Sequence, residues 1–221
     1  ASGKETEIAA DPRADASSVI INPINYEVEA VAFNREKVKW KALSDDIAAD
    51  LKALEAGAPG EPSLAGSDRE RKTWVVAYSA DVTPVTYYLY DRATKKLTKL
   101  FSAKPELAKY KLAEMKPVTI KARDGLELVS YLTLPPGVEP KKLPMVLMVH
   151  GGPWARDNWG YDAGAQWLAN RGYAVLQVNF RGSTGFGKKF LHAGDREWGA
   201  KMHDDLLDAV AWAVKEGYAD E

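Results

Sequence analysis

Two short, continuous apolar runs set the strongest limit on the fold of this chain. They are Pro144–His150 (PMVLMVH) and Tyr173–Phe180 (YAVLQVNF). An unbroken apolar run of this length is typical of a strand that is covered on both faces of a sheet. A helical segment, Tyr161–Gly172, lies between them, and an amphipathic helix follows at Lys201–Gly217. This strand–helix–strand–helix order predicts a mostly parallel α/β sheet in the second half of the chain.

The first half has a different pattern, in which polar and apolar residues alternate. Val28, Ala30 and Ala32 share one face of the segment Tyr26–Phe33, and the alternation continues through Lys37–Leu43. A period of two predicts half-buried antiparallel strands. Strand pairs of this kind, joined by Asp-rich turns, also fit the blades of a β-propeller.

Turn and capping residues divide the chain further. A helix is predicted from Ser44, its N-cap, to Gly57, its C-cap, because Ile47, Leu51 and Leu54 form one apolar stripe between them.

Hairpin turns are predicted at Asp91–Lys95 and at Asp124–Gly125. The segment Phe101–Pro117 between these hairpins is expected to be a linker that ends near Lys116.

The composition excludes several classes of function. The 30 Lys and Arg residues nearly cancel the 31 Asp and Glu residues, so we expect no nucleic-acid or membrane partner. The absence of cysteine excludes disulfides, thiolate metal sites and a cysteine nucleophile. No apolar run reaches the ~20 residues of a membrane helix. The lack of cysteine and the Ala/Lys-rich surface lean towards an exported, periplasmic bacterial protein, although the compartment stays open.

The tetrapeptide His150–Pro153 (HGGP) is the main candidate site. Acyl transfer requires hydrogen-bond donors aimed at the developing oxyanion, and a glycine N–H reaches it without a side chain in the way. We predict that Gly152, with Gly151 beside it, supplies an oxyanion-hole N–H, and that His150 orients the turn. Trp154 is expected to line a substrate pocket. The alternatives are a strand-end turn with glycines for steric reasons and a packing tryptophan.

The loop Phe180–Phe190 (FRGSTGFGKKF) contains a nucleotide-binding pattern that we set aside. Gly182–Lys188 fits G-x-x-x-x-G-K, but Lys189 stands where a P-loop needs Ser or Thr to hold Mg²⁺. The three histidines show no metal-ligand spacing. We therefore predict no cofactor and no metal site.

The same loop also imitates a nucleophile elbow. Ser183 occupies the serine position of G-x-S-x-G, but Arg181 fills the first glycine position. A makeshift triad could be drawn with Asp195 and with His192 or His203. We instead expect Ser183 to be a loop residue, with Arg181 bonded to carbonyls or carboxylates.

Three segments together resemble the start of the catalytic domain of the prolyl oligopeptidase family. They are Leu143–Gly160, Trp167–Phe190 and Met202–Val214, and the closest likeness is to the acylaminoacyl-peptidase and dipeptidyl-aminopeptidase-like branch. HGGP together with N-F-R-G-S-x-G-F-G is specific to this family, since HGGG-type esterases lack the second motif. The earlier segment Thr86–Lys96 is similar to the last blades of the family's propeller.

The resemblance implies a mixed fold in two parts. Residues 1–115 would be the C-terminal part of a β-propeller, made of antiparallel blades. Residues 116–221 would be the N-terminal part of an α/β-hydrolase domain, truncated before the catalytic serine. The family hydrolyses short peptides through an acyl-enzyme, with its serine on a G-x-S-x-G-G elbow after the next strand. The Ser/Asp/His triad is therefore expected outside this chain, which we expect to be inactive alone.

Two alternatives stay open beside this hypothesis. The chain could be a structural, self-associating module, since exposed sheet edges and the helical face of Met202, Leu206 and Val210 favour association. It could also derive from an HGGG-type esterase, although the β-rich first half argues against this. The expected partners are a peptide substrate and the remainder of the same polypeptide, and the exact substrate and oligomeric state stay open.

Overall fold

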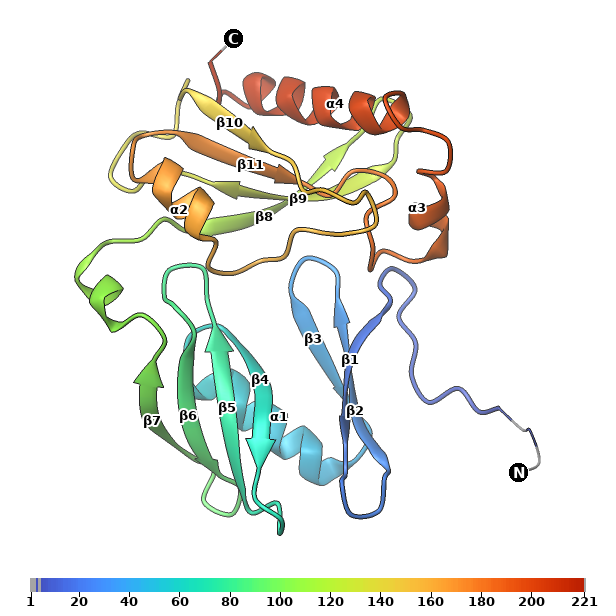
Figure 1. Cartoon of the computed structure of the whole chain (residues 1–221), viewed down its shortest axis with the longest axis vertical. Helices are drawn as coiled ribbons and strands as arrows, with labels where there is room; N and C mark the ends of the chain where they lie inside the picture. The colour runs from blue at the N-terminus through green and yellow to red at the C-terminus, as the bar shows by residue number, and fades with distance from the viewer. Residues whose placement is uncertain (1–2, 4, 221) are drawn as a thin grey trace.

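The computed structural model describes residue 3 and residues 5–220, and arranges their strands in three sheets (Figure 1). Neighbouring strands of the first two sheets are all antiparallel, as predicted for this half. The first sheet has the order β1 (Ala16–Ile21), β2 (Val28–Asn34), β3 (Val38–Ala42). The second has the order β4 (Glu61–Ser67), β5 (Thr73–Ser79), β6 (Thr86–Asp91), β7 (Lys96–Ser102). The predicted turn at Asp91–Lys95 joins β6 to β7 and is confirmed.

The third sheet is mostly antiparallel, which corrects the expectation of a mostly parallel one. Its order is β10 (Met145–Met148), β11 (Ala174–Val178), β9 (Glu127–Thr133), β8 (Met115–Lys121). Only the β10–β11 pair is parallel in the described part of this sheet. The reason is the predicted hairpin at Asp124–Gly125, which contributes β8 and β9 as an antiparallel pair.

The two apolar runs that dominate the sequence differ in how deeply they are buried. Every residue of β11 is buried, as predicted, because β10 and β9 flank it while α4 and α2 cover its two faces. Every residue of β10 is only half-buried, so the prediction of a doubly covered strand is wrong here. β10 lies at the edge of the described sheet, and an edge strand has a neighbour on one side only.

The strand β2 is more deeply buried than its alternation suggests. Ala30 and Ala32 are buried on one face as predicted, but Val31 and Phe33 on the other face are buried as well. The N-terminal segment covers this second face, where Ala14 packs against Val31 and Phe33. The prediction of a half-buried strand is therefore wrong. The segment that covers the second face has no regular structure, so no pattern in the sequence indicated it.

Five helical segments complete the described part of the chain. They are α1 (Asp45–Gly57), the 3₁₀ helix η1 (Pro105–Lys109), α2 (Ala163–Ala169), α3 (Lys188–His192) and α4 (Lys201–Lys215). The stripe of Ile47, Leu51 and Leu54 on α1 is buried, as predicted. Gly57 is the last residue of α1 and Ala58 is the C-cap, so the predicted cap is one residue early. None of these helices is long and apolar enough to cross a membrane.

Helices cover both sides of the third sheet. Figure 1 shows α4 running along its upper side, where Ala209 and Ala213 pack against Leu128 and Leu176 in one core cluster. The shorter α2 packs on the opposite side, against β9 and β11. On α4, Met202 is buried while Leu206 and Val210 are partly exposed.

The first half of the chain is docked under the third sheet by hydrogen bonds to backbone carbonyls. The Arg156 side chain contacts the turn between β2 and β3, where it donates hydrogen bonds to the carbonyls of Asn34 (2.6 Å) and Arg35 (2.8 Å). The buried Tyr131 of β9 donates its hydroxyl to the Glu36 carbonyl over 2.9 Å. The three contacts fix one hairpin of the first sheet below the loop that follows the HGGP turn.

The first and second sheets meet at Glu61. The carboxylate oxygen Oε1 of this β4 residue accepts a hydrogen bond from the Val38 N–H of β3 over 2.9 Å. Burial raises the pKa of Glu61 from 4.5 to about 7, although the Val38 N–H opposes this. A carboxyl group that holds its proton up to about pH 7 therefore lies in the joint between the sheets.

Glu61 should make the stability of the fold depend on pH. Between pH 4.5 and about 7 the folded state holds a proton that the unfolded state has released. The free energy of unfolding should therefore fall as the pH rises through this window. Glu61→Gln should flatten this slope in thermal unfolding measured across the window, and the exposed Glu55→Gln is the control. Equal slopes for the wild type and Glu61→Gln would contradict the assignment.

Candidate functional site: the HGGP turn

The HGGP turn, His150–Pro153, lies at the carboxyl end of the parallel strand β10. Gly152 has φ +136°, and a Cβ added there would lie 2.6 Å from the Trp154 nitrogen, so this position requires glycine. Both Gly151 and Gly152 are exposed. No acceptor among the described residues is bonded to their backbone N–H groups. The turn thus offers unpaired donors at the strand end, where α/β proteins hold ligands.

His150 is held at the start of this turn by contacts on three sides. Its Nδ1 lies 3.0 Å from the Gly151 carbonyl oxygen, and its Nε2 lies 3.0 Å from Ser183 Oγ. The imidazole stacks on the Phe180 ring with 4.7 Å between centroids and 15° between planes. These contacts agree with the expected role of His150 in orienting the turn, which remains a prediction.

Ser183 does not have the environment of a nucleophile. It is fully buried, and its hydroxyl donates to the Phe180 carbonyl over 2.6 Å. A nucleophilic serine instead donates to a base, while Ser183 Oγ has no second proton to give to His150. His192 pairs with Asp195 over 2.9 Å at the exposed surface, and neither of them nor the exposed His203 is bonded to Ser183. The makeshift triad is therefore not assembled.

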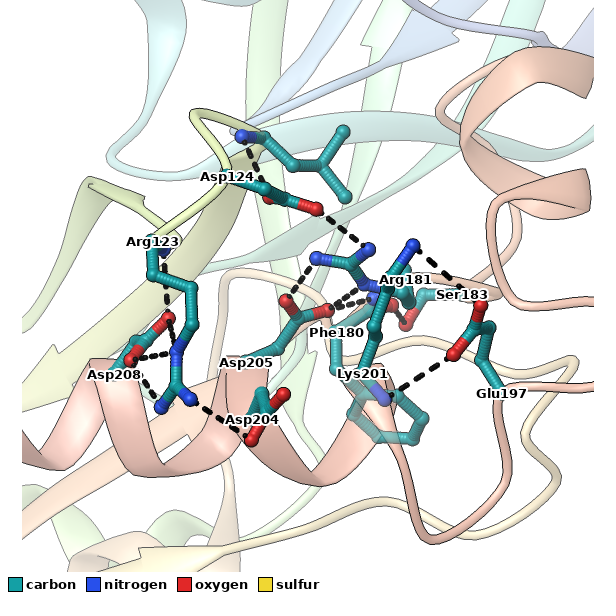
Figure 2. Close-up of polar contacts among 11 residues, drawn as sticks. Arg123, Asp124, Phe180, Arg181, Ser183, Glu197, Lys201, Asp204, Asp205 and Asp208 are labelled. Atoms are coloured by element: carbon teal, nitrogen blue, oxygen red, sulfur yellow. Dashed lines mark hydrogen bonds and ion pairs between the residues drawn. The ribbon is translucent and has the colours of Figure 1, made fainter.

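Arg181 sits in a buried ion pair that anchors this loop (Figure 2). Asp205 of α4 is fully buried and accepts from Arg181 Nε (2.9 Å), Nη2 (2.7 Å) and the backbone N–H (2.8 Å). Asp124 of the β8–β9 turn accepts from Arg181 Nη1 over 2.9 Å. Hydrogen bonds to Asp205 raise the pKa of Arg181, and Arg181 lowers the pKa of Asp124. The expectation that Arg181 bonds carboxylates describes these contacts correctly.

A second ion pair on α4 is more exposed. Arg123, next to Asp124, donates from Nε and Nη2 to Asp208 Oδ1 over 3.0 and 2.8 Å. Its Nη1 lies 3.1 Å from Asp204 Oδ1. Figure 2 shows this pair beside the Arg181 pair on the same helix. The Arg123 side chain is 56% exposed, against 5% for Arg181, so water screens the charge of Arg123 much more strongly.

Asp157 is a half-buried acidic residue in the loop that follows the turn. Burial raises its pKa, while positive charge on His150 acts in the opposite direction. Its Oδ1 accepts from Gln177 Nε2 over 3.2 Å, and its backbone N–H donates to Asn179 over 2.8 Å. The loop that follows the turn is thereby bonded to the end of β11.

Trp154 lies at the surface beside a residue that the sequence did not single out. The Trp154 and Trp198 rings are 6.1 Å apart between centroids, and the two residues are 61% and 65% exposed. Two exposed indoles, one of them two residues after Gly152, give an aromatic surface on which an apolar side chain can rest. No sequence signal pointed to Trp198, because it lies in an irregular segment 44 positions after Trp154.

The two ion pairs of α4 should differ strongly in their effect on stability. Asp205→Ala leaves a buried guanidinium without its main partner and should lower the free energy of unfolding by about 3–5 kcal/mol. Asp208→Ala on the same helix is the matched control, and we expect a much smaller loss because its partner is exposed. Denaturant unfolding of both variants measures the difference. Equal losses would contradict the buried role of Asp205.

Comparison with known proteins relates this geometry to a family. The model described as "Prolyl oligopeptidase family" matches residues 159–221, which begin just after the HGGP turn. Dipeptidyl aminopeptidase BIII of Pseudoxanthomonas mexicana is 52% identical over 224 residues, which cover 98% of this chain and 32% of the relative. Dipeptidyl peptidase family member 6 of Caenorhabditis elegans is 38% identical over 229 residues, covering 94% of this chain and 31% of that protein.

Solved structures share the fold. Acylaminoacyl peptidase of Pyrococcus horikoshii matches with a TM-score of 0.67 at 22% identity, over 94% of this chain and 32% of its own. A puromycin-hydrolyzing peptidase of Mycobacterium tuberculosis matches with a TM-score of 0.70 at 22% identity, over 93% and 31%. The resemblance to the prolyl oligopeptidase family is therefore confirmed, and the chain spans about a third of the length of the curated relatives it matches.

Proposed function

We propose that this chain is part of a serine peptidase that hydrolyses short peptides, releasing dipeptides or acylated amino acids through an acyl-enzyme. The observation that carries the proposal is the HGGP turn, with free N–H groups on Gly151 and Gly152 at the end of β10. The names of the relatives support this reaction class, since they are dipeptidyl and acylaminoacyl peptidases.

In this reaction the turn acts on the carbonyl oxygen of the substrate. When the nucleophilic serine adds to the carbonyl carbon, negative charge develops on that oxygen, and the Gly152 N–H stabilises it by hydrogen bonding. Loss of one such donor costs about 10²–10³-fold in kcat in serine peptidases. The exposed pair Trp154 and Trp198 would contact the side chain of the bound peptide.

The proposal assigns the sheets to two domains. The first two sheets are blades of a β-propeller within residues 1–115, and the third begins an α/β-hydrolase domain within residues 116–221, with its first strand β8 starting one residue before this boundary, at Met115. Residues 1–2, 4 and 221 of these ranges lie outside the described residues. Support comes from the antiparallel four-strand meander β4–β7 and from β8 starting at Met115, after the η1 segment. The triad would lie on further sequence of the same polypeptide, so this chain alone would be inactive.

Self-association is the second candidate, and one observation favours it. On β1, which lies at the edge of the first sheet, Val19 and Ile21 are 45% and 48% exposed. An apolar edge strand can pair with another chain. Sedimentation at increasing concentration separates this candidate from a monomer.

A fluorophosphonate probe tests the proposed peptidase directly. The 221-residue chain should remain unlabelled, whereas a longer polypeptide that carries it should be labelled at one serine and hydrolyse dipeptidyl or acylaminoacyl substrates. Intact mass after labelling and peptide hydrolysis are the two measurements. Labelling of Ser183, or a longer polypeptide that cleaves esters and no peptides, would contradict the proposal.

The two glycines of the turn should respond differently to substitution. Gly152→Ala places a Cβ 2.6 Å from the Trp154 nitrogen and must displace the donor, so we expect a fall in kcat of about 100-fold or more. Gly151→Ala meets no atom within 4 Å and is the adjacent control, with activity near the wild type. Steady-state peptide hydrolysis by the longer polypeptide measures both. A similar loss in the two variants would argue against a specific role for Gly152.

A further inference from the structure

The loop after β11 contacts the HGGP turn on both sides. Before the glycines, Ser183 Oγ lies 3.0 Å from His150 Nε2. After them, the Thr184 N–H donates to the Ala155 carbonyl over 3.0 Å. Consecutive residues of one loop therefore hold both ends of the turn that carries Gly152.

The direction of the hydrogen bond between Ser183 and His150 follows from proton counting. Ser183 has one hydroxyl proton, which it donates to the Phe180 carbonyl at 2.6 Å. Its oxygen can then only accept from His150, so Nε2 must carry a proton and donate it. The Phe180 ring supports the imidazole face. Nδ1 lies 3.0 Å from the Gly151 carbonyl oxygen and donates to it when the ring carries a proton on both nitrogens. The imidazole is thereby fixed in position and in rotation.

The serine itself cannot move easily, because its loop is anchored in the core. Ser183 is fully buried, and its N–H also donates to the Phe180 carbonyl over 3.0 Å. Two residues earlier, Arg181 is bonded to the fully buried Asp205 through its backbone and its guanidinium. Two sets of hydrogen bonds, joined by the backbone between Phe180 and Ser183, thus connect α4 to the turn.

We propose that Ser183 is a positioning residue for the oxyanion turn. By accepting the His150 Nε2 proton it fixes the imidazole, and through the contact of His150 with Gly151 it sets the direction of the Gly152 N–H. This inference rests on the proposed function of the turn. Ser183 takes no part in the covalent chemistry and acts only through His150.

The structural part is tested by NMR on the 221-residue chain itself. In Ser183→Ala the imidazole proton on His150 Nε2 should exchange faster with water, and the amide signals of Gly151 and Gly152 should shift and weaken. With only three histidines in the chain, single substitutions assign the imidazole signals. Ser183→Thr retains the hydroxyl and should keep the wild-type signals.

Ser130→Ala is the matched control, since Ser130 is also fully buried and donates to a carbonyl, that of Leu128. It should leave the turn signals unchanged. Equal changes in Ser183→Ala and Ser130→Ala would overturn the inference. If Ser183→Ala does not fold, His150→Phe keeps the stacking on Phe180 and removes both nitrogens. Unchanged glycine signals in that variant would also overturn the inference.

Catalysis by the longer polypeptide gives the second readout. Ser183→Ala should lower kcat about 10-fold and leave KM within about twofold of the wild type. A displaced donor stabilises the oxyanion of the transition state less well, while binding of the substrate changes little. Ser183→Thr should restore most of kcat. An unchanged kcat beside altered glycine signals would overturn the positioning role. A longer polypeptide without peptidase activity would contradict the proposed function while the NMR result still stands.

Discussion

The buried ion pair between Arg181 and Asp205 is the interaction on which the organisation of the candidate site depends. One guanidinium joins three elements that are distant in sequence: the turn before β9, the loop after β11, and α4. A buried charge is unfavourable unless each of its donors is satisfied, so this pair admits few alternative arrangements of the loop. Because the loop then contacts the HGGP turn, the geometry of two exposed glycines is set from the core of the molecule.

The site combines this rigid, buried support with exposed residues that can contact a substrate. Gly151, Gly152, Trp154 and Trp198 are exposed, while Ser183 and Arg181 behind them are buried. A group that must bind a substrate has to face solvent, whereas the groups that orient it are most effective where they cannot move. The separation of binding from orientation also explains why a buried serine with a histidine neighbour need not be a nucleophile.

The sequence predicted those elements whose signal is local. The stripe on α1, the turns at Asp91–Lys95 and Asp124–Gly125, and the fully buried β11 follow from short-range pattern. The half-exposed β10 and the doubly covered β2 were missed, because their cover depends on which segments pack against them.

The buried charges were harder to predict, but one signal was present. Asp205 lies three residues after Met202 and four before Ala209, on the buried stripe of α4. An acidic residue on an apolar stripe indicates a buried partner, and Arg181 was the candidate that the family motif already supplied. Trp198 had no such signal, since its neighbour Trp154 is brought near only by the fold.

The joint between the two halves has a consequence for motion. Gln166 of α2 is buried and donates to the Asp81 carbonyl (3.0 Å) and the Ala113 carbonyl (2.7 Å), and it accepts from the Ala113 N–H (2.8 Å). The Gln166 side chain thus bonds both the end of the connecting segment and the β5–β6 loop to α2. A rotation that opened the halves by bending within residues 103–112 would leave both bonds between Gln166 and Ala113 intact. It would have to break the bond from Gln166 to Asp81 together with those of Arg156 and Tyr131 to the β2–β3 turn, so the halves cannot separate at one contact alone.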